Sequence, residues 1–403
     1  MQRMRLMQSK SEYKFNIPEY VCTVLDRLCE QGESAYVVGG SLRDMMLFSE
    51  PHDFDVASSA LPERVCEIFS DMHVIKTGLQ HGTVTVVCQG RPIEITTFRV
   101  DGEYHDMRRP DSVSFTRRIE DDLSRRDFTV NAMAYNERDG LVDLFFGQAD
   151  LKNRIIRTVG DPYERFSEDA LRIMRAFRFS AQLGFEIEEK TLKAAGALGE
   201  RLSFIAKERI FSELVKLICS PYPEKPLMAM RSLGVFDYVF ENYIPSERAI
   251  MLLSQVEKSD IARLSALFCD RDEATARREL IRLKASRKQR GASVIVDAAK
   301  TKVSSREDMA ALRARLSLDA DIALSLSVLL GNSPREALTL LDDATPFSIS
   351  QLAIGGSELI SLGYSGREIG KTLARLLDEV IKAPTLNNRS ELLKMASKWK
   401  LDE

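Results

Sequence analysis

The spacing of apolar residues changes near residue 150, and this change limits the folds open to the chain. Before it, short runs rich in β-branched residues alternate with polar positions, a pattern typical of strands. After it, apolar residues recur every three or four positions, a pattern typical of amphipathic helices. The strand-like runs are residues 35–40, 82–100, 129–135 and 140–145. The sequence therefore predicts an α+β fold, with a mixed-sheet domain first and an all-helical remainder after it.

Two further patterns refine this prediction. β-branched residues on both sides of Gln89-Gly90-Arg91-Pro92 predict a hairpin within residues 82–100. The predicted helices are residues 20–31, 42–47, 168–182, 207–219, 263–268, 273–284 and 366–382. Three prolines in residues 219–226 indicate a joint between helical units. We expect four parts, with bounds 1–150, 151–220, 221–320 and 321–403.

Composition excludes several classes of protein. The net charge of the 403 residues is −3, so any affinity for nucleic acid must come from local patches. Six scattered cysteines without a C-x-x-C pair argue against a zinc site and against a disulfide framework. Neither a signal peptide nor an uncharged apolar run of about 20 residues is present. We expect a cytoplasmic protein with no membrane segment.

Three Asp-x-Asp pairs occur in the chain, and only their surroundings distinguish them. The pairs are Asp53 and Asp55, Asp270 and Asp272, and Asp319 and Asp321. A short strand through the first pair would point both carboxylates to one face, where they suit a hard cation such as Mg²⁺. Glu94, in a later strand-like run, adds a third carboxylate, although a surface-facing strand position would explain it equally well. Three carboxylates on adjacent strands beside a glycine loop meet the requirement of two-metal nucleotidyl transfer.

Candidate phosphate-binding groups flank these carboxylates. Gly39 and Gly40 separate a strand-like run from a helix, a place where backbone N–H groups can approach an anion, although tight turns explain most such pairs. Arg125 and Arg126 offer planar donor groups to phosphate or ribose oxygens, and Asp127 can accept from sugar hydroxyls. A surface charge cluster is the alternative for this Arg-Arg-Asp run.

A polar stripe follows on the predicted helix 168–182. Arg165, Asp169, Arg172 and Arg175 recur at spacings of three and four, so they share one face. A solvated stripe of helix ion pairs would explain them. Alternatively, a carboxylate and a guanidinium at i and i+3 can accept from the amino group and donate to the ring nitrogen of cytosine or adenine. Asp169 and Arg172 would then admit CTP and ATP and reject GTP and UTP.

These stretches together resemble a known family. The segments "GGSLRDMMLFSEPHDFDVAS", "HGTVTVVCQGRPIEITTFRVDGEYHDMRRPD", "LSRRDFTVNAMAY", "DPYERFSEDALRIMRAFRFSAQLGFEIE" and "ERIFSELVKL" occur in the order found in bacterial class II tRNA nucleotidyltransferases, the CCA-adding enzymes. The resemblance covers about residues 20 to 240 and weakens toward the C-terminus. One departure is Phe48-Ser49-Glu50, where the family commonly has a turn of glycine and a basic residue.

The resemblance implies a polymerase-β-like head followed by an elongated helical neck, body and tail. It implies template-independent addition of C, C and A to tRNA from CTP and ATP, with Mg²⁺ and without an obligate protein partner. Asp53 and Asp55 would hold the metal and Glu94 would assist. The nucleotide-binding residues would be Gly39, Gly40, Arg43, Arg125, Arg126, Asp127, Asp169, Arg172 and Arg175. Residues 99–113 would form the flexible loop needed to add the final A.

By the same resemblance, the helical remainder would hold the acceptor arm and elbow of tRNA. Residues 277–290 contain seven basic residues and one acid, enough for a phosphate-binding surface, although an exposed helix face explains them equally well. Arg367 and Lys371, after glycine turns, are further candidates for backbone-phosphate contacts.

Three rival functions remain open. An A-adding enzyme or a poly(A) polymerase of the same fold would not add C. A metal-dependent phosphohydrolase could use the His52-Asp53 and His105-Asp106 pairs, but no histidine follows His105 to complete its ligands. A non-catalytic RNA-binding protein would release no pyrophosphate from CTP.

Overall fold

The computed structural model describes residues 15–51, 53–76, 78–79, 82–101, 113–298, 303–316, 320–329, 331–341 and 345–402. His52, His105 and most of the expected flexible loop lie outside these residues. The chain forms two compact units. The first comprises Met1–Ile210 and Ser232–Val239, and the second comprises Phe211–Arg231 and Phe240–Glu403.

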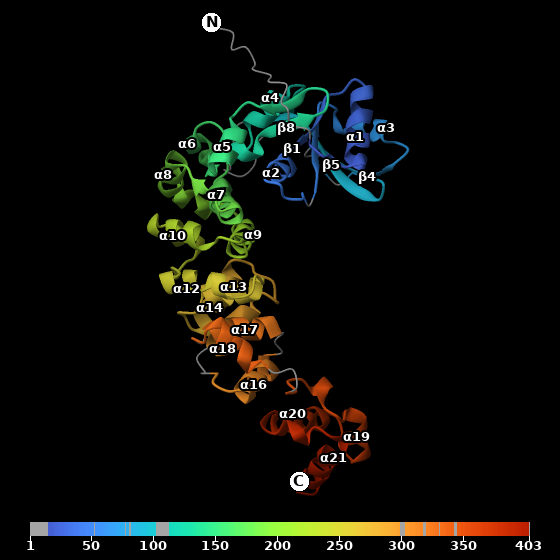
Figure 1. Cartoon of the computed structure of the whole chain (residues 1–403), viewed down its shortest axis with the longest axis vertical. Helices are drawn as coiled ribbons and strands as arrows, with labels where there is room; N and C mark the ends of the chain where they lie inside the picture. The colour runs from blue at the N-terminus through green and yellow to red at the C-terminus, as the bar shows by residue number, and fades with distance from the viewer. Residues whose placement is uncertain are drawn as a thin grey trace. The chain divides into compact units, whose positions relative to one another are not determined.

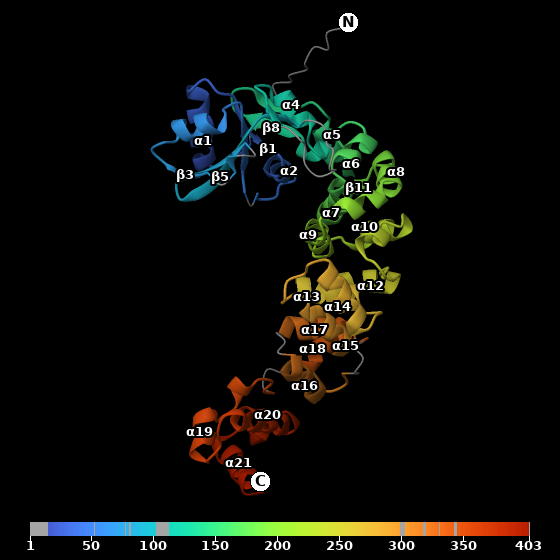
Figure 2. The same cartoon turned by 180° about the vertical axis from the view of Figure 1, so that it is seen from behind.

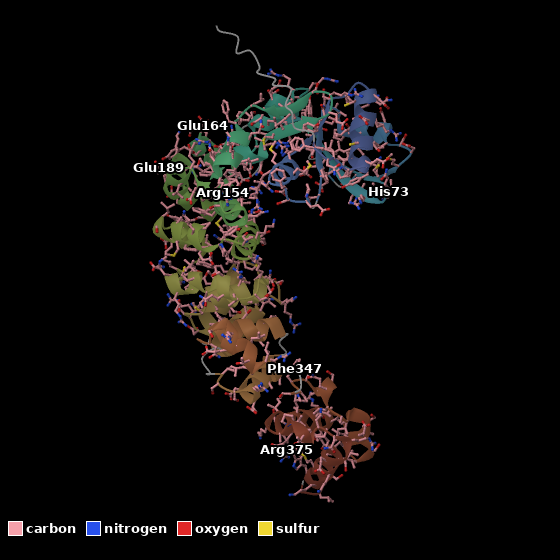
Figure 3. All side chains as sticks on the ribbon, in the orientation of Figure 1. His73, Arg154, Glu164, Glu189, Phe347 and Arg375 are labelled. Carbon is pink, nitrogen blue, oxygen red and sulfur yellow. The ribbon has the colours of Figure 1, made fainter. Side chains whose placement is uncertain are left out.

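A seven-stranded sheet forms the centre of the first unit, within the part of the chain that the structure describes (Figure 1). Its strands, in spatial order, are β3 (His73–Ile75), β4 (Thr83–Cys88), β5 (Arg91–Thr97), β2 (Asp55–Ser58), β1 (Ala35–Val38), β8 (Met133–Asn136) and β9 (Gly140–Asp143). β2 and β5 run parallel, and the other neighbours run antiparallel. The prediction of a mixed-sheet first domain is confirmed. His73 is exposed on the edge strand β3 (Figure 3).

Helices cover both faces of this sheet. α1 (Glu19–Glu30) and α3 (Pro62–Ile68) pack on β4 (Figure 1), and Figure 2 shows α1 from behind. α4 (Ile119–Ser124) buries Ile119 and Leu123 against Tyr36 and Val38 of β1. α2 (Gly40–Met46) follows β1 directly and contacts both β1 and β8. The turn between β1 and α2 thereby lies against the sheet.

The expected hairpin is present between β4 and β5. Cys88 pairs with Arg91, which leaves Gln89 and Gly90 as the two turn residues. Their φ values are +50° and +75°, as a two-residue hairpin turn of the primed type requires. Gly90 meets this requirement without strain because it lacks Cβ.

Three local expectations were wrong. Residues 129–135 begin with a 3₁₀ turn (Thr129–Asn131) before β8, because the backbone folds back and Asn131 N–H bonds Phe128 O. Beyond residue 150 strands do not disappear, since β10 (Ile155–Ile156) and β11 (Glu186–Ile187) form a short parallel pair. The helix predicted over 168–182 is two helices, α6 (Pro162–Glu168) and α7 (Leu171–Leu183).

The break between α6 and α7 has a side-chain cause. Asp169 ends α6 in an extended conformation, at φ −139° and ψ 103°. Its Oδ1 accepts the backbone N–H of Leu171 at 3.0 Å, in the manner of a helix cap. Aspartate often competes for backbone donors in this way, so the break places its carboxylate at a helix junction rather than on a helix face.

β6 (Arg99–Asp101) and β7 (Val113–Phe115) pair antiparallel as a separate two-stranded sheet. The α-helices not yet named follow. They are α5 (Gly147–Asn153), α8 (Glu189–Ala197), α9 (Lys207–Ile218), α10 (Glu224–Ser232), α11 (Phe236–Val239), α12 (Glu247–Met251), α13 (Asp260–Leu267), α14 (Glu273–Arg282), α15 (Gly291–Ala298), α16 (Arg306–Leu316), α17 (Ala320–Leu329), α18 (Pro334–Leu340), α19 (Gly356–Ser361), α20 (Arg367–Lys382) and α21 (Arg389–Asp402). They confirm the prediction of a mostly helical remainder.

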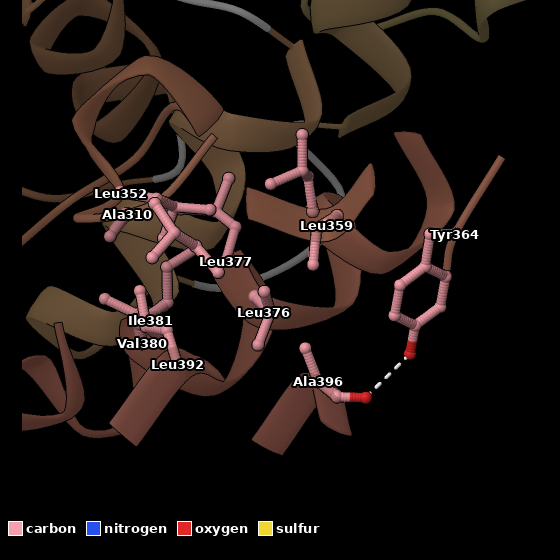
Figure 4. Close-up of a cluster of buried hydrophobic side chains, with 12 residues drawn as sticks. Ala310, Leu352, Leu359, Tyr364, Leu376, Leu377, Val380, Ile381, Leu392 and Ala396 are labelled. Carbon is pink, nitrogen blue, oxygen red and sulfur yellow. Dashed lines mark hydrogen bonds between the residues drawn. The ribbon is translucent and has the colours of Figure 1, made fainter. Parts of the chain in front are cut away.

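The last helices enclose their own apolar core, drawn in Figure 4. α20 buries Leu376 and Val380 completely, and α21 adds Leu392 and Ala396. The Tyr364 hydroxyl donates to Ala396 O at 2.8 Å within this core. Among the described residues, the structure holds no helix that could cross a membrane.

Candidate active site

The three predicted carboxylates lie at the junction of β2 and β5. In the parallel register of these strands Asp55 stands opposite Glu94. Phe54 and Val56 are buried, and Asp53, Asp55 and Glu94 are exposed. The alternation expected for the Asp-x-Asp pair is therefore confirmed, although β2 begins only at Asp55 and Asp53 precedes it.

The Asp55 carboxyl is electrostatically disfavoured in its charged form. Surrounding protein removes part of its hydration, and the charges of Asp53 and Glu94 repel it, so its pKa is raised. The Arg126 guanidinium opposes this rise. A group that carries unfavourable negative charge beside two more carboxylates is suited to bind a cation.

The exposed carboxylates fit a Mg²⁺ ion that protein and substrate would coordinate together. In the described part of the chain, no three Asp, Glu, His or Cys side chains already close around one point as a metal cage would. Mg²⁺ in phosphoryl-transfer sites is usually held by one or two carboxylates, with the remaining positions taken by water and substrate phosphates. Asp53 and Asp55 supply two such carboxylates, and both are exposed.

The glycine pair forms a tight turn that the arginine side chains line. Gly39 has φ +74°, and a Cβ there would lie 3.1 Å from Arg126 Nη1. A Cβ on Gly40 would lie 3.4 Å from Arg43 Nη2. Glycine at both positions therefore lets two guanidiniums approach the backbone that leads into α2.

A buried carboxylate that was not anticipated orients the arginine pair. Asp122 of α4 is 1% exposed, and it accepts from Arg125 Nη2 at 2.6 Å and from Arg126 Nη2 at 3.1 Å. Burial alone would raise the pKa of Asp122, but Arg126 and Arg125 outweigh this effect and hold the pKa below its ordinary value. The sequence signal was available, because Asp122 precedes the two arginines by three and four residues.

Asp127 belongs to a second buried network. Its Oδ2 accepts from Arg175 Nε at 2.7 Å, and its Oδ1 accepts from Phe128 N–H and from Asn131 Nδ2. Burial would raise the pKa of Asp127, but Arg175 and Asn131 hold it below the ordinary value. Asn131 Oδ1 also accepts from Arg43 Nη1 at 2.8 Å. Asn131, which links Arg43 to Asp127, is a second residue that sequence reasoning missed.

The proposed base-reading pair makes separate contacts. Asp169 Oδ2 accepts from Arg209 Nη2 of α9 at 2.9 Å. Arg172 is buried and donates to Glu168 Oε2 and to Arg125 O. The carboxylate and the guanidinium are thus held by different partners. Glu168 and Arg209 were not anticipated as members of the site.

The predicted residues, which come from separate stretches of sequence, form a linked set. Arg126 interacts with Asp55 and shares Asp122 with Arg125, and the backbone of Arg125 receives Arg172. By contrast, the second Asp-x-Asp pair is structural, since Asp270 pairs with Arg248 and Asp272 caps α14. Asp319 lies outside the described residues, as does the side chain of Asp321.

Similarity to known proteins agrees with this geometry. Residues 35–157 match the "Poly A polymerase head domain", and residues 184–246 match the "Probable RNA and SrmB- binding site of polymerase A". The chain is 47% identical over 236 residues to the CCA-adding enzyme of Streptococcus gordonii, a match covering 59% of this chain and 57% of that protein. It is 50% identical over 222 residues to the enzyme of Leuconostoc mesenteroides, covering 55% and 54%. The matched region thus spans just over half the length of these curated relatives.

A solved structure extends the similarity over most of the chain. The crystal structure of the Bacillus stearothermophilus CCA-adding enzyme in complex with CTP is 28% identical, with a TM-score of 0.76. The alignment covers 95% of this chain and 98% of that one. Residues 35–157 of the chain thus match the poly A polymerase head domain, and almost the whole chain shares the fold of this CCA-adding enzyme.

Proposed function

We propose that this chain adds C, C and A to the 3′ end of tRNA, using CTP and ATP. The observation that carries the proposal is the pairing of Asp55 with Glu94, with Arg126 close enough to Asp55 to oppose the rise in its pKa. This arrangement puts negative charge for a metal beside positive charge for a triphosphate. In the reaction the 3′ oxygen of tRNA bonds to the α-phosphorus and the bond to the β-phosphate breaks, which releases pyrophosphate.

Metal dependence is general in this family of nucleotidyltransferases. Asp53 and Asp55 would hold Mg²⁺, and Glu94 would assist from the neighbouring strand. Bound there, Mg²⁺ would lower the pKa of the attacking hydroxyl and screen the triphosphate and the leaving pyrophosphate. The exposure of all three carboxylates supports this assignment, because substrate oxygens can reach them.

The chain's own donors would orient the nucleotide. Arg125 and Arg126 would donate to phosphate oxygens, with Arg43 and the Gly39-Gly40 turn beside them. Asp127 would accept from the ribose hydroxyls, and Arg175 would keep that carboxylate ionised. Because Asp122 already orients the arginine pair, little conformational entropy is lost when phosphate binds.

Base selection would rest on Asp169 and Arg172. Cytosine and adenine each present an amino donor beside a ring-nitrogen acceptor, which a carboxylate and a guanidinium complement. Guanine and uracil present a carbonyl acceptor beside a ring N–H donor. Their N–H would face the guanidinium donor, and their carbonyl would face the carboxylate acceptor. The partners observed here, Arg209 and Glu168, would hold the two side chains apart until a base bridges them.

The second unit would bind the tRNA acceptor arm and elbow. Most of the basic side chains in residues 277–290 are exposed, which suits contacts with backbone phosphates. Glu279, the acidic residue of this stretch, is buried against Arg282. We place the protein in the cytoplasm, and its six cysteines, all unpaired, agree with a reducing compartment.

One assay tests the proposal directly. The full chain is incubated with Mg²⁺ and tRNA lacking its 3′-terminal CCA, first with CTP alone and then with CTP and ATP. We expect two added C residues in the first reaction and a complete CCA end in the second. A chain that adds A but no C is an A-adding enzyme or a poly(A) polymerase. Binding of tRNA without pyrophosphate release identifies an RNA-binding protein, and both results contradict the proposal.

A further inference from the structure

Three arginine side chains lie over one aromatic ring, that of Phe179, next to the proposed nucleotide-binding residues. Phe179 of α7 is 5% exposed, and the guanidinium carbons of Arg178, Arg175 and Arg43 lie over its ring at 3.9, 5.2 and 5.4 Å from the centroid. Phe128 meets the same ring edge-on, with centroids 5.6 Å apart. The face of an aromatic ring attracts cations, and the attraction strengthens where water is excluded.

Two of these arginines belong to different helices of the proposed site. Arg43 lies on α2, directly after the glycine turn, and Arg175 lies on α7, which follows the base-reading junction. Their polar ends converge as well. Arg43 donates to Asn131 and Arg175 donates to Asp127, while Asn131 and Asp127 bond each other.

The Phe179 ring is the apolar contact shared by Arg43 and Arg175. Asn131 and Asp127 fix the donor atoms of the two guanidiniums, and Phe179 supports their planes. An aliphatic side chain of similar volume would fill the space but present no negative face. Removal of the ring would therefore loosen Arg43 and Arg175 without unpairing their hydrogen-bond partners.

We propose that Phe179 is a positioning residue that keeps the glycine turn and the base-reading helix in register through Arg43 and Arg175. The expected effect of Phe179 on nucleotide binding rests on the function proposed above. Phe179 itself lies under the arginines, so it acts through them.

The matched control is Phe177, two residues earlier on the same helix. Phe177 is fully buried, and no arginine of the described residues lies over its ring. Phe177→Leu and Phe179→Leu thus remove the same ring from the same helix, one without and one with bound guanidiniums. Phe179→Tyr keeps the ring and serves as the rescue variant.

CTP binding to the full chain is measured by titration calorimetry for each variant. We expect Phe179→Leu to weaken CTP binding about tenfold relative to Phe177→Leu. Phe179→Tyr should bind CTP within about twofold of the unmodified chain. Equal affinities for the two leucine variants would overturn the positioning role.

A second measurement does not depend on nucleotide. The urea midpoints of Phe179→Leu, Arg43→Met and the double variant form a cycle that isolates the interaction of ring and guanidinium. We expect the double variant to lose less than the sum of the two single losses. Additive losses would overturn the inference even if CTP binds. Coupled losses in a chain that binds no CTP would refute the proposed function and leave the ring–arginine contact standing.

Discussion

Asp55 of β2 stands opposite Glu94 of β5 in parallel register, so two carboxylates distant in sequence face the same solvent region. The folded chain holds this pair at a cost, because the pKa of Asp55 is raised by lost hydration and by repulsion from Asp53 and Glu94. Local negative charge held at a cost in stability is typical of functional sites, where a bound cation can relieve the repulsion.

Replacement of this charge should stabilise the chain and abolish its activity. Asp55→Asn is expected to raise the free energy of unfolding at pH 7 by up to about 1 kcal/mol, a value limited by solvent screening. Nucleotide incorporation should fall at least about 100-fold, because one of the two proposed metal ligands is lost. Urea unfolding and the incorporation assay measure the two effects.

The stability gain of Asp55→Asn should depend on pH. The folded pKa lies above the ordinary value of 3.8, so the penalty is absent below 3.8 and develops as pH rises through the folded pKa. The gain should vanish at pH 3. Asp272→Asn, in the second Asp-x-Asp pair, is the control, because asparagine caps a helix as well as aspartate does. A gain that persists at pH 3 contradicts the electrostatic explanation.

Asp122 should contribute strongly to stability. Asp122→Ala leaves Arg125 and Arg126 without their buried partner, and about 3 kcal/mol of unfolding free energy should be lost at pH 7. The pKa of Asp122 is lowered in the fold, so its contribution is present above the ordinary value of 3.8 and is lost as pH falls through the folded pKa. Glu120→Gln, on the same helix, removes an ion pair of 3.7 Å with exposed Arg118 and should cost under about 0.5 kcal/mol. Similar losses for the two variants would contradict the role of Asp122.

Asp169 should govern the choice of base. Asp169→Ala removes the proposed acceptor for the amino group of cytosine or adenine, so discrimination of CTP against UTP should fall by about 10-fold or more. Dependence on Mg²⁺ concentration should stay unchanged, because Asp53 and Asp55 remain. Single-nucleotide incorporation with CTP and with UTP measures the ratio. Unchanged discrimination against UTP would remove Asp169 from the base-reading role.

Phe48 occupies a backbone conformation better suited to glycine. Its φ is +56° and its side chain is fully exposed, so the residue carries strain without burying apolar surface. Phe48→Gly should therefore be more stable than Phe48→Ala by about 1 kcal/mol. Thermal unfolding of the two variants tests this, and equal stabilities would contradict the expected strain.

Local patterns predicted much of the first unit. The alternation of β-branched residues predicted β1, β4, β5 and β9. Gln89-Gly90 predicted the turn of the hairpin between β4 and β5. The same reasoning missed the break at Asp169, because residues on both sides keep helical periodicity while one side-chain hydrogen bond interrupts the backbone. The four-part division of the chain and the roles of the site residues stay predictions.

The sequence by itself determined which chemical groups are present and in which order. It predicted that two aspartates share an exposed face beside a strand, that a glycine pair precedes a helix and that arginines recur at helical spacing, because these features depend only on neighbouring residues. Only the tertiary structure decided which carboxylate faces which partner. Asp55 faces Glu94, Asp122 receives Arg125 and Arg126, and Asp169 receives Arg209. Strand register and side-chain pairing are set by packing across elements, and many alternative pairings satisfy the same spacing in sequence.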